Sequence, residues 1–207
     1  MGVKERREHE KEVRREQILD AARKLLFSKG LKATSVNKIA KEAELSIGTI
    51  YFYYKNKEEI FAVLQEEGLN LLFKEIEKIY RKKTDPRNKL KNMGLAYLNF
   101  SEKEKDYFEI INYFISSTEI LFPPNIKNQI DESGGKILSL VTLTIDEGIN
   151  KGLFVSGDSN KFAIMFWAMN HGLIQLKKLK NTIMHGRDYK NLYLSSIDCL
   201  LDGFAYK

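Results

Sequence analysis

The sequence predicts an all-α protein, and three of its features lead to this expectation. Only three prolines occur in 207 residues, at positions 86, 123 and 124. Apolar residues recur every three or four positions, which places them on one face of a helix. No alternation of apolar and polar residues, the pattern of a half-buried strand, continues for more than a few residues. Since 43% of the residues are hydrophobic, the chain can bury a substantial core.

The amino-terminal part of the sequence predicts three helices. We expect the first from about Glu12 to Lys29, because an apolar stripe runs through it and Gly30 is a good helix stop. A short second helix follows Thr34-Ser35, either of which can cap it. Ser46 is suited to cap a third short helix.

Six longer helices are expected in the rest of the chain, which brings the total to nine. Asn56 opens the fourth helix, of about six turns, and Glu59 completes an N-cap box of the Asn-x-x-Glu kind. Proline favours a first helical position, so Pro86 opens the next helix. Breaks in the apolar pattern then predict helices near 86–102, 105–116, 125–151, 159–180 and 188–205.

Charge and cysteine content bound the cellular setting. The net charge is +6; residues 1–60 hold 14 Lys/Arg and 10 Asp/Glu, so most of the positive excess lies in the first third of the chain. That distribution is expected where this end meets phosphate. A single cysteine, Cys199, excludes an intramolecular disulfide and favours a reducing compartment. The charged amino terminus resembles no secretory signal, and no apolar run approaches the roughly 20 residues that span a bilayer. We therefore expect a soluble, cytoplasmic protein without membrane association.

The two short helices, joined by Glu44-Leu45-Ser46, have the size and spacing of a helix-turn-helix. Small side chains at Ala40 and Ala43 let the helices cross closely, and Gly48 and Thr49 keep the start of the third helix slim enough to approach base edges in a major groove. Hydroxyls at helix starts, together with backbone N–H groups, favour phosphate. Lysine in the first turn of the fourth helix also indicates a nearby anion. The predicted DNA contacts are Thr34, Ser35, Ser46, Ile47, Gly48, Thr49, Tyr51, Phe52, Tyr53, Lys55 and Lys57.

Four consecutive aromatic residues, Tyr51-Phe52-Tyr53-Tyr54, close the third helix. They point around its whole circumference, so they cannot all be buried in a short helix. We expect Ile47, Ile50, Tyr51 and Tyr54, with part of Phe52, to face inward and Tyr53 to be exposed. The alternative is that all four aromatic residues belong to the core.

The segment TSVNKIAKEAELSIGTIYFYYKNKEEIF, residues 34–61, resembles the signature of the TetR family of transcriptional regulators. Two positions depart from the pattern: Glu44 replaces the usual turn glycine, so the turn becomes left-handed at some strain or changes its geometry, and Tyr54 replaces the usual phenylalanine. The resemblance implies a helix-turn-helix domain over residues 1–56 and a helical ligand-binding and dimerisation domain over 57–207. The matching positions are Thr34, Ile39, Ala40, Ala43, Ser46, Gly48, Thr49, Tyr51, Tyr53 and Lys57.

A family-like pocket between the fourth and eighth helices is the expected ligand site. Met and aromatic side chains often line adaptable apolar pockets, although each of them taken singly is more often ordinary core. His171 has no partner at metal-ligand spacing, so a hydrogen-bonded core histidine is expected there and no metal site. No catalytic motif or cofactor fingerprint occurs, so we expect neither enzyme activity nor a cofactor. The predicted ligand contacts are Leu72, Met93, Tyr97, Tyr113, Phe114, Trp167, Asn170 and His171.

Three hypotheses about function remain. In the first, a homodimer, formed in the family by the last two helices, binds a palindromic operator as a repressor and is released by a small, largely apolar effector. Its recognition helices would then enter major grooves about 34–36 Å apart. In the second, the same DNA binder is controlled by a protein partner and its core is filled. In the third, the chain is an enzyme or a lipid carrier that binds no DNA.

Overall fold

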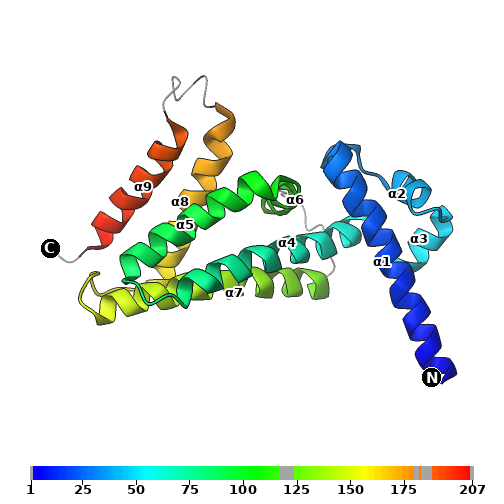
Figure 1. The fold of residues 1–207 in the computed structure, drawn as a ribbon, viewed down its shortest axis with the longest axis horizontal. Coiled ribbons are helices and arrows are strands. Elements are labelled where there is room, and N and C mark those ends of the chain that lie inside the picture. The colour runs from blue at the N-terminus through cyan, green and yellow to red at the C-terminus, as the bar shows by residue number, and fades with distance from the viewer. Residues whose placement is uncertain (1, 117–123, 180–181, 183–187, 206–207) are drawn as a thin grey trace. The chain divides into compact units, whose positions relative to one another are not determined.

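The protein is helical, as the sequence predicts. A computed structural model describes residues 2–116, 124–179, 182 and 188–205, and within these ranges it contains nine α-helices and no strand beyond an isolated bridge (Figure 1). The helices are α1 (Val3–Lys29), α2 (Val36–Glu42), α3 (Ile47–Tyr53), α4 (Lys57–Tyr80), α5 (Pro86–Lys103), α6 (Lys105–Ser116), α7 (Pro124–Asn150), α8 (Ser159–Leu176) and α9 (Tyr189–Phe204). Two 3₁₀ turns, η1 (Leu31–Ala33) and η2 (Lys177–Leu179), follow α1 and α8.

The predicted start of the first helix near Glu12 is wrong, because α1 begins at Val3. Its first turns carry no continuous apolar stripe and are stabilised by polar contacts within the helix. The Glu5 carboxylate accepts a hydrogen bond of 2.8 Å from the backbone N–H of Gly2, and Arg6 pairs with Glu10 at 3.0 Å, one turn along. Helix-forming charged residues therefore extend the helix where apolar periodicity gives no signal.

The chain divides into two compact units, which are described separately. The first comprises residues 1–68 and 104–130, and the second comprises residues 69–103 and 131–207. The helices α4 and α7 contribute residues to both units. The boundary that we expect between residues 56 and 57 is functional, since it separates the residues that meet DNA from the rest, and it stays a prediction.

In the first unit, α1 packs against α2, and α2 packs against α3. Ile18, Ile39 and Ile50, one from each helix, are fully buried in this small core. Arg23 of α1 forms a two-pronged contact with the Glu67 carboxylate of α4, at 2.8 and 3.2 Å. Tyr107 of α6 donates its hydroxyl to the same carboxylate at 2.9 Å. Burial and this carboxylate raise the pKa of Tyr107 to about 12, so the hydroxyl stays a donor at neutral pH.

In the second unit, α5 packs against both α8 and α9. The closest approach is at Gly94 of α5, whose carbonyl accepts a hydrogen bond of 3.0 Å from the buried Tyr193 hydroxyl of α9. At the edge of this contact, Lys91 pairs with Asp198 at 2.8 Å. No helix in the described ranges is both long and apolar enough to cross a membrane.

Candidate functional site

The turn between α2 and α3 is left-handed at Glu44. This is one of the two outcomes expected from the replacement of the usual glycine. Glu44 has φ 54°, and it is the one residue other than glycine with positive φ in the described part of the chain. Its N–H donates to the Lys41 carbonyl at 3.3 Å, and the N–H of Leu45 donates to the Ala40 carbonyl at 2.9 Å. These two bonds form a Schellman motif, which satisfies the last carbonyls of α2 and directs the chain into α3.

Side-chain hydroxyls cap both short helices. Ser46 accepts a hydrogen bond of 3.0 Å from the N–H of Thr49 at the start of α3, and Ser35 accepts one of 3.4 Å from Lys38 at the start of α2. Ser35 and Ser46 remain exposed. Thr34 differs, since it is 1% exposed and its hydroxyl donates to the Gly30 carbonyl at 3.0 Å. The prediction that Thr34 contacts DNA therefore needs correction, because this side chain closes the turn before α2.

The surface of α3 is strongly apolar and uncovered. Phe52 is 78% exposed and Tyr51 is 53% exposed, whereas Tyr54 is 3% exposed. Tyr53, the ring expected to be exposed, is half-buried. The expectation that Tyr51 and part of Phe52 face inward is wrong, as is the alternative that all four aromatic residues are core. Tyr54 is buried as expected.

The remaining side chains of α3 are likewise divided between the core and the surface. Ile50 is fully buried, as predicted, but Ile47 is 45% exposed and the inward orientation expected for it is wrong. Gly48 is exposed and Thr49 is half-buried, so the start of α3 presents small side chains. The helix therefore offers Ile47, Tyr51 and Phe52 to a partner outside the unit.

The start of α4 is capped largely as the sequence predicts. The Asn56 side chain accepts a hydrogen bond of 2.9 Å from the N–H of Glu59, while the Glu59 carboxylate accepts one of 2.8 Å from Lys55, a residue before the cap. The Lys57 ammonium lies 3.9 Å from the carboxylate of Glu58. Lys57 therefore has an anionic neighbour within the chain, and its position in the first turn does not by itself require DNA phosphate. Lys55 is exposed.

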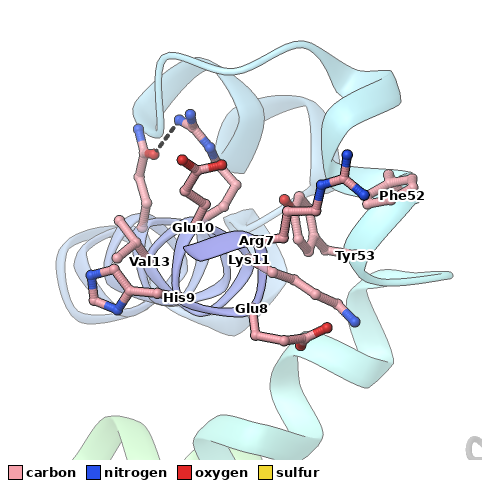
Figure 2. Close-up of a pocket in the computed structure, with 10 residues that line it drawn as sticks. Arg7, Glu8, His9, Glu10, Lys11, Val13, Phe52 and Tyr53 are labelled. Atoms are coloured by element: carbon pink, nitrogen blue, oxygen red, sulfur yellow. Dashed lines mark hydrogen bonds between the residues drawn. The ribbon is translucent and has the colours of Figure 1, made fainter. Parts of the chain in front are cut away.

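Basic residues of α1 border a hollow beside α3, which the sequence analysis did not include in the site. Arg7, Lys11 and Arg14 line this hollow of about 530 Å³ together with Phe52 and Tyr53. Figure 2 shows Arg7 and Lys11 on the side of α1 that faces the two rings, with His9 and Val13 on the other side. Their spacing of three and four residues was the available signal for this shared face.

A small cavity in the second unit contains most of the predicted ligand contacts. It has a volume of about 30 Å³ and is lined by Leu72, Ile76, Met93, Gly94, Tyr97, Ile137, Val141, Phe166, Trp167 and Asn170. The predicted residues Tyr113 and Phe114 belong to the first unit and are not part of this lining. His171 is not part of the lining either, although it neighbours Asn170. The volume suffices for about two water molecules, and ligand sites commonly have roughly 300–1,000 Å³.

One polar atom at this cavity, the side-chain oxygen of Asn170, accepts no hydrogen bond from the described residues. The buried amide nitrogen of the same side chain donates to the Phe166 carbonyl at 2.7 Å. His171 lies 2.8 Å through Nδ1 from the Tyr97 hydroxyl and stacks on Trp167 at 5.2 Å. Burial lowers the pKa of His171, which favours the neutral imidazole at neutral pH. Among the described residues, no group of three His, Cys, Asp or Glu side chains could hold a metal ion.

Comparison with known proteins identifies the family. Residues 18–64 match the family described as bacterial regulatory proteins, tetR family. The uncharacterized HTH-type transcriptional regulator YhgD of Bacillus subtilis (strain 168) is 30% identical over 162 residues, which cover 78% of this chain and 82% of the relative. The chain belongs to the TetR family. It is a DNA-binding transcriptional regulator, and members of the family are not enzymes.

The likeness to regulators of Bacillus subtilis extends over most of the chain. The fatty acid metabolism regulator protein of Bacillus subtilis (strain 168) is 24% identical over 179 residues, 81% of this chain and 90% of the relative. The crystal structure of the regulator FadR from Bacillus subtilis in complex with stearoyl-CoA superposes with a TM-score of 0.71 at 23% identity, covering 91% of this chain and 98% of that one. This likeness extends the TetR fold beyond the helix-turn-helix.

Proposed function

We propose that the chain is a homodimeric TetR-family repressor that binds a palindromic operator and is released by a small, largely apolar effector. One observation carries the DNA-binding part of this proposal. The capped helix α3 leaves Phe52 78% exposed and Tyr51 53% exposed beside the small residues that begin the helix. Residues 1–56 would meet the DNA, and residues 57–207 would bind the effector and the second subunit. Because its target is the chromosome, we expect such a regulator in the cytoplasm.

Fluorescence anisotropy with the promoter region of its own gene tests operator binding. Phe52→Ala should weaken binding to the operator by roughly 10-fold, since burying a Phe side chain contributes about 1.5–3 kcal/mol. It should leave the unfolding temperature unchanged, because the side chain is exposed. Leu143→Ala in α7, where an apolar side chain is 47% exposed, is the matched control. Salt-sensitive binding without preference for a palindrome would count against a specific regulator.

An acyl chain is the effector class that we propose. The fatty acid metabolism regulator and the stearoyl-CoA complex among its relatives support this choice, and so does the apolar lining of the cavity. The effector would have to bind a conformation with a wider cavity, which separates the side chains of α4, α5 and α8. Leu72 and Ile76 line the cavity from α4, and α4 also supplies residues to the first unit. A shift of α4 would therefore lower operator affinity.

Stearoyl-CoA is the probe for this step. Its addition to the protein–operator complex should dissociate the DNA, and at about 100 times its Kd it should add about 2.7 kcal/mol to the free energy of unfolding. Met93→Phe should fill the cavity and make the protein insensitive to stearoyl-CoA while it still binds DNA. Coenzyme A without an acyl chain is the control ligand, and dissociation by it would contradict an apolar effector.

Control by a protein partner is the second candidate, and the small volume of the cavity favours it. At about 30 Å³ the core is almost filled, as a DNA binder without a small-molecule site requires. This candidate predicts that acyl-CoA compounds of any chain length leave both the unfolding temperature and the operator affinity unchanged. The same two measurements therefore separate the candidates.

A further inference from the structure

We propose that the amino-terminal part of α1, residues 3–17, is a second DNA-contacting element whose basic face binds backbone phosphates beside the bases that α3 reads. The inference rests on the proposed DNA binding and adds a surface to it. It is carried by three observations, which concern the distribution of charge around α1, the position of the basic face next to α3, and the lack of acidic partners for its cations.

Charge is segregated around this part of α1. At about 100° per residue, Lys4, Arg7, Lys11 and Arg14 fall within about 80° of one another. Four of the five acidic residues in residues 3–17 occupy a different sector, again about 80° wide and centred about 120° away, and the fifth, Glu10, lies between the sectors and pairs with Arg6. The four are Glu5, Glu8, Glu12 and Glu16. No carboxylate interrupts the face that carries the four cations, in contrast to the alternating charges of a helix that is merely solvated.

The basic face continues into the buried face of the same helix. Ile18 lies in the middle of the basic sector and is fully buried in the core with α2 and α3. At the edge of the sector, the Arg15 guanidinium lies 5.2 Å from the centre of the buried Tyr54 ring. The direction in which α1 packs on the helix-turn-helix therefore also directs its basic residues toward the side of α3.

The cations and two aromatic rings of α3 border the same hollow. Arg7, Lys11 and Arg14 line it from α1 together with the carboxylates of Glu8 and Glu10, so the cations outnumber the anions there. Phe52 and Tyr53 line it from α3 (Figure 2). The two rings pack edge to face at 5.1 Å. DNA whose bases meet α3 would thus bring its phosphates near the α1 cations. Arg7 and Arg14 lie about 10 Å apart along the helix axis, and duplex DNA carries a charge about every 1.7 Å, so several contacts are available.

These cations have no acidic partner within the described residues. Within residues 3–17, Arg6 forms an ion pair with Glu10, and Arg6 lies outside the basic sector. Arg7 and Lys11 form no ion pair in the described chain, and Arg14 donates to the neutral Gln17 side chain at 2.7 Å. Gln17 in turn donates to the Ala43 carbonyl at 2.7 Å, which attaches this amino-terminal part of α1 to the end of α2. A row of like charges repels itself, and bound phosphate would remove that repulsion.

The test is the salt dependence of DNA binding by Arg7→Gln/Lys11→Gln, measured by anisotropy over a range of salt concentrations. Loss of two phosphate contacts should lower the slope of log Kd against log salt by about 2. Affinity at low salt should fall at least 10-fold, equally for operator and unrelated DNA, because phosphate contacts carry no sequence information. Arg7→Gln alone should lower the slope by about 1.

Arg6→Gln is the matched control, since it removes the same charge from the adjacent residue, which lies on another face and is paired with Glu10. It should leave the slope unchanged. Circular dichroism checks that each variant keeps its helix content. A wild-type slope in Arg7→Gln/Lys11→Gln, or an equal effect of Arg6→Gln and Arg7→Gln, would overturn the inference. If the wild type binds all DNA alike, the proposed regulator fails, but the slope on unrelated DNA still decides whether this amino-terminal part of α1 contacts phosphate.

Discussion

Glu44 holds the turn between α2 and α3 in a conformation that suits glycine. A side chain with a Cβ costs about 1–2 kcal/mol at a left-handed φ such as the 54° of Glu44. Glu44→Gly should therefore raise the free energy of unfolding by about 1 kcal/mol, after the extra flexibility that glycine gives to the unfolded chain is subtracted. Urea unfolding followed by circular dichroism measures the change.

Lys41→Gly, at an exposed position inside α2, is the control for this substitution and should lower stability by about 1 kcal/mol. Equal losses for the two variants would show that the turn is not strained at Glu44. The resemblance to the family signature identified this position, because Glu44 stands where the pattern has glycine, and the left-handed φ is one of the two outcomes expected there.

The buried hydroxyls of Tyr54 and Tyr193 differ in their hydrogen bonding. The Tyr54 hydroxyl has no hydrogen-bond partner in the described residues, whereas the Tyr193 hydroxyl donates to the Gly94 carbonyl at 3.0 Å. A buried polar group without a partner costs about 1–3 kcal/mol. We therefore expect Tyr54→Phe to raise the free energy of unfolding and Tyr193→Phe to lower it by about 1 kcal/mol. Thermal unfolding of both variants measures these opposite signs, and a loss in Tyr54→Phe would reveal a partner for that hydroxyl.

The burial of individual α3 residues could not be predicted from the sequence. Four adjacent aromatic residues gave the correct inference that some are exposed, but a seven-residue helix has too few turns for its apolar pattern to fix its rotation. Packing within the first unit, where α3 lies against α2, decides the matter: Ile50 and Tyr54 are buried, while Ile47 and Tyr51 are exposed. Thr34 was misplaced for a related reason, since its sequence position before α2 does not reveal that its hydroxyl turns back to Gly30.

At the scale of whole helices, caps were predictable and the start of α1 was not. Ser46 and Asn56 cap α3 and α4 as expected, because a short polar side chain before an apolar stripe is a local signal. The first turns of α1 have charges at helical spacing but little apolar pattern, so an interpretation based on hydrophobic periodicity began the helix at Glu12 instead of Val3. The same omission concealed the basic face of α1.

Helix α5 packs tightly at Gly94, while α7 contains glycines that face open space. A Cβ on Gly94 would lie 2.4 Å from Cδ1 of Ile197, but one on Gly135 would meet no atom within 4 Å. Gly94→Ala should therefore destabilise the protein by about 1–3 kcal/mol through overpacking. Gly135→Ala should stabilise it by about 1 kcal/mol, because alanine is the better helix former. Denaturant unfolding of the pair tests both signs; a neutral Gly94→Ala would mean that α9 moves aside without cost.

At the scale of the whole chain, aromatic composition predicted a ligand site more broadly than the structure supports. Met93, Tyr97, Trp167 and Asn170 do line one cavity, because they lie on the facing sides of α5 and α8. Tyr113 belongs to the other unit, so an excess of aromatic residues in neighbouring helices did not mean one site. Packing between residues far apart in the sequence decides which apolar faces meet. The apolar pattern of a single helix does not reveal its partner.

The assembly of two subunits is the prediction that concerns the whole molecule. One face of α8 is apolar and uncovered, with Ile164 47%, Met165 43% and Leu176 45% exposed, and the small residues Ala168 and Gly172 lie on the same face. A two-fold partner would bury this face against its own copy. Met165→Glu should therefore convert the dimer to a monomer in sedimentation experiments and reduce operator affinity at least 100-fold, because each subunit then binds one half-site alone. Leu143→Glu replaces an equally exposed side chain, at 47%, on α7 and should remain dimeric. A monomeric wild type, or a Met165→Glu variant that stays dimeric, would exclude this face as the dimer interface.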